Sequence, residues 1–172
     1  MLAMQYPKHV GRQWLLINVS QQRLYYLKDQ KLKADYPISS AKNGTGCEEN
    51  SGKTPLGGHF IREKIGDNAP FCANFKGRKL TGEIPEILTQ ANQTYDADYI
   101  TSRILWLSGL DTDYNLGSGV DSYQRYIYIH GTAEEGRLGE PVSHGCIRMA
   151  NHDIIELYDR VTVDSLVYIY EQ

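Results

Sequence analysis

The sequence is poor in cysteine and phenylalanine, and it has neither a long apolar run nor an excess of positive charge. Its 172 residues include three cysteines and three phenylalanines. So small and odd a number of cysteines argues against a disulfide-stabilised scaffold. Lys and Arg total 18 against 21 Asp and Glu, for a net charge of −3. Proteins that bind nucleic acid normally carry a basic patch, so no nucleic-acid partner is expected.

The N-terminal region lacks the features of a signal peptide or a membrane span. Residues 1–12 contain no apolar segment, and the first apolar run, Trp14–Val19, is short and contains Asn18. If Met1 is the native start, we expect a cytoplasmic protein with no membrane partner. A periplasmic location is the alternative if a leader has been removed.

Tyrosine and glycine are abundant, with 13 and 16 residues, in a chain that is 41% hydrophobic and 23% charged. This composition is typical of a folded protein built from strands and structured loops rather than of a disordered chain or a helix bundle. The length predicts one domain over residues 1–172, with residues 1–12 as an N-terminal extension.

Short runs of aromatic and β-branched residues between turn residues predict a mainly β fold. The expected strands cover residues 14–19, 23–28, 31–38, 59–64, 104–107, 125–129 and 166–170. Residues 66–102 are polar and turn-rich, so we expect short helical segments and a functional insertion or lid there.

One clear helix is expected near the C-terminus, at about residues 151–161. Asn151 is a suitable N-cap, and Asp153 lies in the first turn. The apolar residues recur at helical spacing and predict one buried face, formed by Ile154, Leu157, Tyr158 and Val161.

The segment 126–149 contains the residue types of nucleophilic catalysis. A strand-like run ends at His130, and residues 132–142 form a loop that can bring Cys146 back beside it. A cysteine needs a base or positive surroundings to become a thiolate near neutral pH, and imidazole titrates in the right range. Cys146 is therefore a candidate nucleophile, and His130 is its candidate base.

Two neighbours of Cys146 extend this interpretation. Gly145 leaves room for a substrate carbonyl, and the backbone N–H groups of Gly145 and Cys146 can point at a developing oxyanion. Arg148 can bind a substrate carboxylate through two parallel hydrogen bonds.

Two other interpretations remain open at this point: an inert buried cysteine and a zinc site. The zinc ligands would be His130, His144, Cys146 and His152. The spacing of His144 and Cys146 is too tight for a standard chelating pair, so we expect no metal and no cofactor. Of the other cysteines, Cys47 is expected to be an exposed loop thiol and Cys72 a small buried residue.

The run Ser143-His-Gly-Cys-Ile-Arg148, preceded by His130-Gly-Thr132, resembles the signature of the L,D-transpeptidase catalytic domain, the YkuD-type domain of bacteria. The likeness extends from about Trp14 to Tyr170. It also includes the stretches 22–25, 36–39, 53–60 and 151–161.

This resemblance implies a YkuD-type β-sandwich of mixed sheets with the nucleophile loop between them. It also implies chemistry on peptidoglycan stem peptides, at the bond between the L-centre of diaminopimelate and the terminal D-Ala of a tetrapeptide. Cys146 would form an acyl-enzyme and release D-Ala. An amine acceptor then gives transpeptidation, whereas water gives carboxypeptidase action.

The same resemblance assigns roles to individual residues. Cys146 would be the nucleophile and His130 the base, with the Gly131 carbonyl orienting His130 and His144 completing the catalytic set. The amides of Gly145 and Cys146 would form the oxyanion hole. Segment 66–125 would line the substrate groove, and the expected substrate-binding residues are Arg148, Ser143, Tyr128 and Trp106.

The function expected from the sequence is that of an L,D-carboxypeptidase in murein recycling, which removes D-Ala from a tetrapeptide or muropeptide. One alternative is an L,D-transpeptidase that forms cross-links or exchanges D-amino acids in the cell envelope. A second is a non-catalytic muropeptide-binding module.

Overall fold

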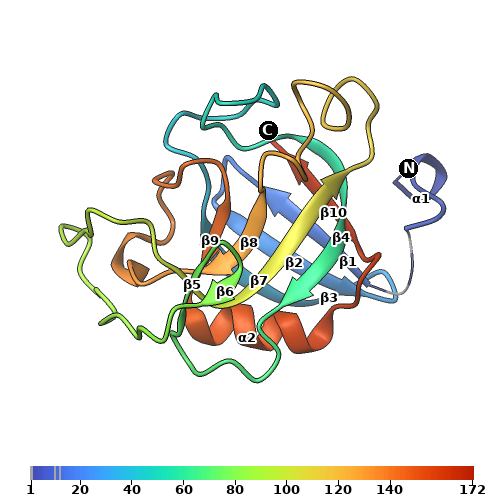
Figure 1. Ribbon diagram of the computed structural model, residues 1–172. Coiled ribbons are helices and arrows are strands. Elements are labelled where there is room, and N and C mark those ends of the chain that lie inside the picture. The colour runs from blue at the N-terminus through green and yellow to red at the C-terminus, as the bar shows by residue number, and fades with distance from the viewer. Residues whose placement is uncertain (1, 10, 12) are drawn as a thin grey trace.

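The structure is a computed structural model that describes residues 2–9, 11 and 13–172 (Figure 1). Its elements in chain order are α1 (Leu2–Gln5), β1 (Gln13–Asn18), β2 (Arg23–Lys28), β3 (Lys31–Ser39), β4 (Gly57–Ile65), β5 (Asn74–Lys76), β6 (Lys79–Leu80), β7 (Ile100–Gly109), β8 (Tyr128–Gly131), a 3-10 turn η1 (Glu135–Arg137), β9 (Ile147–Met149), α2 (Asn151–Arg160) and β10 (Leu166–Tyr170). No helix among these residues combines the length and hydrophobicity needed to cross a bilayer.

The strands form one mixed sheet that closes on itself. Their order is β4-β10-β1-β2-β3-β9-β8-β7-β5-β6, and β4 also pairs with β7. The pairs β1–β10 and β8–β9 are parallel, and the other pairs are antiparallel. The prediction of a mainly β fold with mixed strands is confirmed. The two faces of the expected sandwich are joined by the β4–β7 pairing into a continuous wall, and the β5–β6 hairpin extends from β7.

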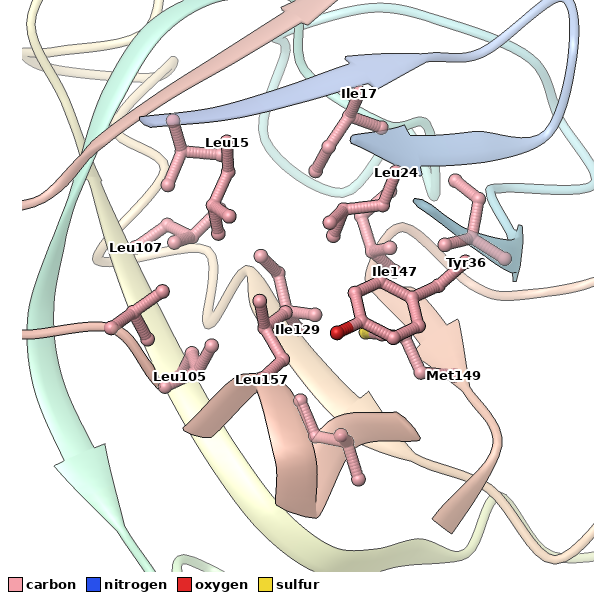
Figure 2. Packing of buried hydrophobic residues seen from close by; sticks show 14 of the residues in the cluster. Leu15, Ile17, Leu24, Tyr36, Leu105, Leu107, Ile129, Ile147, Met149 and Leu157 are labelled. Atoms are coloured by element: carbon pink, nitrogen blue, oxygen red, sulfur yellow. The ribbon is translucent and has the colours of Figure 1, made fainter. Parts of the chain in front are cut away.

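The main core lies inside this wall and beneath α2 (Figure 2). Alternate residues of the strands point inward, among them Leu15, Leu24 and Leu105, and all three are fully buried. The predicted apolar face of α2 closes the core through Ile154 and Leu157. The helix therefore covers one side of the closed sheet, as Figure 1 shows.

Strand β7 separates this main core from a second cluster. Leu105 and Leu107 point into the main core, whereas Ile104 and Trp106 point the other way, toward Phe75 of β5. Period-two alternation explains the division, because successive side chains of a strand lie on opposite faces. The second cluster underlies the site described below.

Most predicted strands lie within two residues of their observed bounds. The exceptions are the strand expected at 104–107, which already begins at Ile100, and the strand expected at 125–129, which begins only at Tyr128. Tyr126 has a φ of 57° and closes a turn, which delays the start of β8. The predicted N-cap is also wrong, because Ala150 occupies that position. The Asn151 side chain instead accepts hydrogen bonds from Thr101 and Ser102, both at 2.6 Å.

The helical segments expected within residues 66–102 are absent from the structure, which describes this region completely. It contains turns and the β5–β6 hairpin instead. Left-handed backbone at Gly66, Cys72 and Gly82 and the prolines Pro70 and Pro85 interrupt any helix.

The expected N-terminal extension 1–12 falls partly outside the described residues, at positions 1, 10 and 12. Within it, Tyr6 is buried and its hydroxyl donates to Asp111 at 2.8 Å. The single-domain boundary stays a prediction.

Candidate active site

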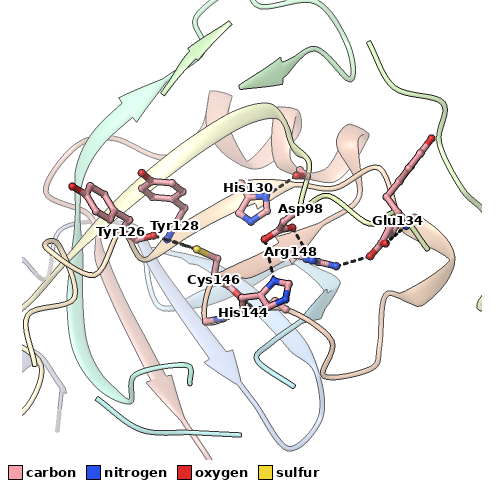
Figure 3. Close-up of polar contacts among 12 residues, drawn as sticks. Asp98, Tyr126, Tyr128, His130, Glu134, His144, Cys146 and Arg148 are labelled. Carbon is pink, nitrogen blue, oxygen red and sulfur yellow. Dashed lines mark hydrogen bonds and ion pairs between the residues drawn. The ribbon is translucent and has the colours of Figure 1, made fainter. Parts of the chain in front are cut away.

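The parallel pairing of β8 and β9 places Cys146 and His130 on one face of the sheet. Ile129 pairs with Ile147, and both side chains lie in the main core. Because side chains alternate, His130 faces the opposite side, as does Cys146 immediately before β9 (Figure 3). The structure thus places the two principal candidate residues on the same face of the sheet, with His130 in β8 opposite Arg148 and Cys146 in the residue before β9.

Cys146 is partly exposed, and two backbone groups hold its thiol. Sγ donates to the carbonyl of Tyr126 at 3.2 Å and accepts from the N–H of Tyr128 at 3.3 Å (Figure 3). Burial raises the pKa of Cys146 to about 12, and the Tyr128 N–H lowers it only in part. The resting thiol is therefore neutral, and nucleophilic attack requires a base.

His130 has the protonation and tautomer of a base. Its Nδ1 donates to the carbonyl of Gly131 at 2.6 Å, which leaves Nε2 to accept a proton. The ring is 1% exposed, and burial lowers its pKa below the ordinary value, against the opposing effects of Asp98 and Gly131. The imidazole is thus neutral near pH 7, and the Gly131 carbonyl makes the contact with His130 that the family resemblance implies.

Asp98 is a charged member of the site that sequence reasoning missed. Its carboxylate bonds Arg148 at 2.7 Å and faces His144 Nδ1 at 3.4 Å. Burial by itself raises the pKa of Asp98, but His130 and Arg148 outweigh burial and hold it below its ordinary value. A fixed negative charge near His130 stabilises the imidazolium that forms when the thiol loses its proton.

Arg148 does not have the freedom that the carboxylate-binding prediction requires. Its two terminal nitrogens bond Asp98 and Glu134, each at 2.7 Å, and its side chain is 5% exposed. A bidentate substrate contact would have to break both ion pairs, of which the pair with Glu134 is buried. Arg148 instead holds Asp98 in place.

The nucleophile loop is fixed by two buried hydroxyls. Ser143 Oγ donates to the carbonyl of Cys146 at 2.5 Å and accepts from the N–H of Gly145 at 3.2 Å. Thr54 Oγ1 donates to the carbonyl of Gly145 at 3.0 Å and accepts from the N–H of Ala41 at 2.9 Å. Ser143 is 2% exposed, so it braces the loop rather than contacting substrate. In this resting state the Gly145 amide, a predicted oxyanion donor, bonds Ser143.

Trp106 and Tyr128 form an aromatic wall behind Cys146. The rings of Trp106 and Tyr128 meet edge to face with centroids 5.5 Å apart, and Trp106 stacks on Tyr123 at 4.1 Å. Cys146 packs against this cluster. Trp106 is 7% exposed and Tyr128 is 5% exposed. These two predicted substrate-binding residues therefore support the site mainly through packing and present little surface to a substrate.

His144 stands exposed between two cavities. A cavity of about 530 Å³ lies on its side toward Asp98 and Arg148, and a cavity of about 350 Å³ lies on its side toward Arg125 and Tyr126. Its side chain is 78% exposed, unlike that of His130. A substrate can therefore reach His144 from either side.

The four residues of the alternative zinc interpretation are not grouped as metal ligands. His152 lies on α2 and packs on Phe71 with ring centroids 4.6 Å apart. Within residues 2–9, 11 and 13–172, no group of three His, Cys, Asp or Glu side chains is placed to hold a metal ion.

The sequence-based view of Cys47 is wrong: the residue is buried, with 7% exposure. Arg125 reaches across from another loop and donates to the carbonyls of Gly46 and Cys47 at 3.3 and 3.1 Å. This contact ties the backbone at Gly46 and Cys47 to the segment that carries Arg125. Cys72 is buried as expected, with 2% exposure.

A neutral thiol, a buried neutral imidazole and a nearby carboxylate on a closed β-sheet define a candidate cysteine-dependent catalytic domain. The family model of the L,D-transpeptidase catalytic domain, YkuD, matches residues 12–169. The chain belongs to this family, which confirms the resemblance seen in the sequence.

Individual relatives agree with this membership. YqjB of Bacillus subtilis (strain 168), which carries an L,D-transpeptidase name, is 42% identical over 45 residues, or 26% of each chain. L,D-transpeptidase 3 from Mycobacterium tuberculosis in complex with a faropenem-derived adduct is 17% identical, with a TM-score of 0.59 over 93% of this chain and 60% of that chain. An L,D-transpeptidase from Mycobacterium smegmatis is also 17% identical, with a TM-score of 0.54 over 92% of this chain and 58% of that chain. The chain thus spans about three fifths of these solved chains, and at such identity the likeness shows the fold.

The three cysteines are free, and their exposure predicts selective alkylation. We expect iodoacetamide to modify Cys146 in the folded protein and to spare the buried Cys47 and Cys72. Because burial raises the pKa of Cys146 to about 12, the reaction is slow at neutral pH and accelerates as pH rises. Peptide mass spectrometry at a series of pH values measures both effects. A fast rate that does not change with pH would indicate a preformed thiolate and contradict this account.

Thr54→Val tests the bracing of the nucleophile loop. The substitution keeps the shape but leaves the Ala41 N–H and the Gly145 carbonyl buried without a partner, which costs about 1–3 kcal/mol. Urea unfolding should show this loss in the valine variant, whereas Thr54→Ser should retain the stability of the original protein. Equal unfolding midpoints for the valine and serine variants would show that the two hydrogen bonds contribute nothing.

Proposed function

We propose that the protein is an L,D-carboxypeptidase that acts on peptidoglycan stem tetrapeptides through an acyl-enzyme at Cys146. The observation that carries this proposal is the placement of the Cys146 thiol and the His130 imidazole on one face of the β8–β9 pair. Membership of the L,D-transpeptidase family supplies the substrate class.

In the proposed reaction, His130 Nε2 takes the thiol proton as Sγ attacks the carbonyl of diaminopimelate. The new S–C bond forms, the C–N bond to D-Ala breaks, and the imidazolium returns the proton to the leaving amine. Asp98 stabilises the imidazolium in between, since it lies close enough to oppose the burial effect on the pKa of His130. Water, activated by the same imidazole, then hydrolyses the thioester.

The oxyanion that forms on the substrate carbonyl needs N–H donors. We assign this role to the amides of Cys146 and Gly145, as the sequence predicted. The Gly145 N–H must then exchange its bond to Ser143 Oγ, which is long at 3.2 Å, for the oxyanion. A weakly held donor of this kind is available to a stronger, charged acceptor.

A second candidate function is transpeptidation, and the two cavities on either side of His144 favour it. One cavity could hold the donor peptide and the other an amine acceptor. Both reactions share the acyl-enzyme and differ only in what attacks it.

Product analysis separates the two functions. Purified protein is incubated with a disaccharide tetrapeptide, and the products are followed by mass spectrometry. Hydrolysis gives loss of one D-Ala and no dimer, whereas abundant cross-linked dimer would overturn the carboxypeptidase assignment. A non-catalytic binding module would leave the tetrapeptide intact.

A further inference from the structure

Arg78 stands at the tip of the β5–β6 hairpin, above the aromatic wall of the site. Its guanidinium lies 4.9 Å from the centre of the Trp106 ring and 5.1 Å from that of Tyr126. Its Nη1 donates to the hydroxyl of Tyr128 at 3.2 Å. Tyr128 in turn directs its backbone N–H at Cys146 Sγ, so one tyrosine separates this cation from the thiol.

Arg78 differs from the other arginines near Cys146 in its partners. Arg148 is held by two carboxylates, and Arg125 donates to the carbonyls of Gly46, Cys47 and Lys53. Among the contacts of the described residues, Arg78 has a neutral phenol and aromatic faces but no carboxylate. A guanidinium on aromatic faces keeps its donors available at its edge, in a geometry that matches a carboxylate.

The backbone of the hairpin tip supports a dedicated role for this side chain. Gly77 and Arg78 are the two central residues of the turn, with φ values of 54° and 65°, and Lys76 pairs with Lys79. Such a turn favours Asn, Asp or Gly at both positions, because both are left-handed. An arginine is disfavoured in this conformation, so its presence points to a role for the side chain. The tight turn also fixes the position of the Arg78 Cα relative to the site.

We propose that Arg78 binds a carboxylate of the substrate beside the scissile bond, which is the role that the local sequence predicts for Arg148. This inference rests on the proposed function, since a stem tetrapeptide presents carboxylates there. The terminal carboxylate of D-Ala is one residue, about 3.5 Å of extended chain, beyond the attacked carbonyl. The side-chain carboxylate of diaminopimelate is the other source of the same chemistry.

Binding measured without turnover tests this proposal. In a Cys146→Ala, Trp14→Phe background, the fluorescence of Trp106, which lies under the guanidinium, is titrated with three tetrapeptides. One has free carboxylates, one has a C-terminal amide, and one has the diaminopimelate side-chain carboxylate amidated. We expect Arg78→Gln to weaken binding of the free acid about 10- to 100-fold, as for loss of a charge-assisted hydrogen bond. The amidated peptide that lacks the carboxylate bound by Arg78 should bind the Cys146→Ala protein and its Arg78→Gln variant with equal affinity.

Arg62→Gln is the matched control, because Arg62 is an exposed arginine whose guanidinium lies 3.9 Å from the centre of the Tyr123 ring. It should leave all three affinities unchanged, and Arg78→Lys should restore part of the affinity for the free acid. Equal weakening of all three peptides by Arg78→Gln, or no measurable binding of the free acid to the parent protein, would overturn the proposal. Turnover is measured separately on the Cys146 enzyme, so the absence of D-Ala release would refute the proposed function and leave the binding result standing.

Discussion

Cys146→Ala is expected to abolish release of D-Ala from a stem tetrapeptide. Removing a nucleophile that forms a covalent intermediate costs at least about 10³-fold in kcat, because no other group can form the acyl-enzyme. The measurement is the rate of D-Ala release by the purified variant, followed by mass spectrometry.

Cys72→Ala is the matched control for this substitution. Cys72 is also a free thiol and is buried, but it bonds the carbonyl of Pro85 and takes no part in the site. The control variant should keep the activity of the original protein once its folding is verified by circular dichroism. Activity retained by Cys146→Ala and lost in Cys72→Ala would contradict the assignment of the nucleophile.

His130→Gln is expected to lower kcat by about 10²- to 10⁴-fold, the range for loss of a general base. The pH profile gives a sharper prediction. Falling pH protonates the imidazole and removes the base, so activity declines on the acid side. Because burial lowers the pKa of His130, this decline should lie below pH 6.5, the ordinary value for imidazole.

The acid-side decline should disappear from the residual activity of His130→Gln. The matched control is His152→Gln, since His152 is exposed on α2 and packs on Phe71. It should keep both the rate and the pH profile of the original protein. An acid-side decline at or above pH 6.5, or one that survives in His130→Gln, would assign the titration to another group.

Local patterns in the sequence were enough to predict the strands and the principal pair of site residues. Alternation and turn residues delimit β2 and β10 as observed, and the spacing of apolar residues predicts the buried face of α2. Cys146 and His130 could be identified because both lie in one short segment of the sequence. His130 is near the end of β8, and Cys146 directly precedes β9.

The rest of the site depends on contacts between residues far apart in the chain. Asp98 reaches Arg148 across 50 positions, and Thr54 reaches Gly145 across 91. Nothing local to Arg148 indicates that its charge is already paired, so the local sequence predicts a free carboxylate ligand there. Arg78 could not be singled out either, since only the folded hairpin brings it over Trp106.

Unfavourable backbone conformations also explain why some strand and helix bounds could not be predicted from the sequence. The left-handed backbone at Tyr126 delays the start of β8, and that at Cys72 is one of several interruptions in the region where helices were expected. Neither residue type favours that conformation. An exposed thiol is the local prediction for Cys47, but the residue is buried, and Arg125 from a distant part of the chain donates to its carbonyl. The compartment and the acceptor of the acyl group stay predictions.

The central claim is that Cys146 becomes acylated by the stem peptide. Intact-protein mass spectrometry after rapid acid quenching, followed by peptide mapping, tests it most directly. The account predicts a thioester on the peptide containing Cys146, with the mass of the tetrapeptide donor less D-Ala, and no such adduct in Cys146→Ala. D-Ala release without any adduct at Cys146 under quenching conditions that preserve thioesters, or an adduct on Cys47 or Cys72 instead, would contradict it.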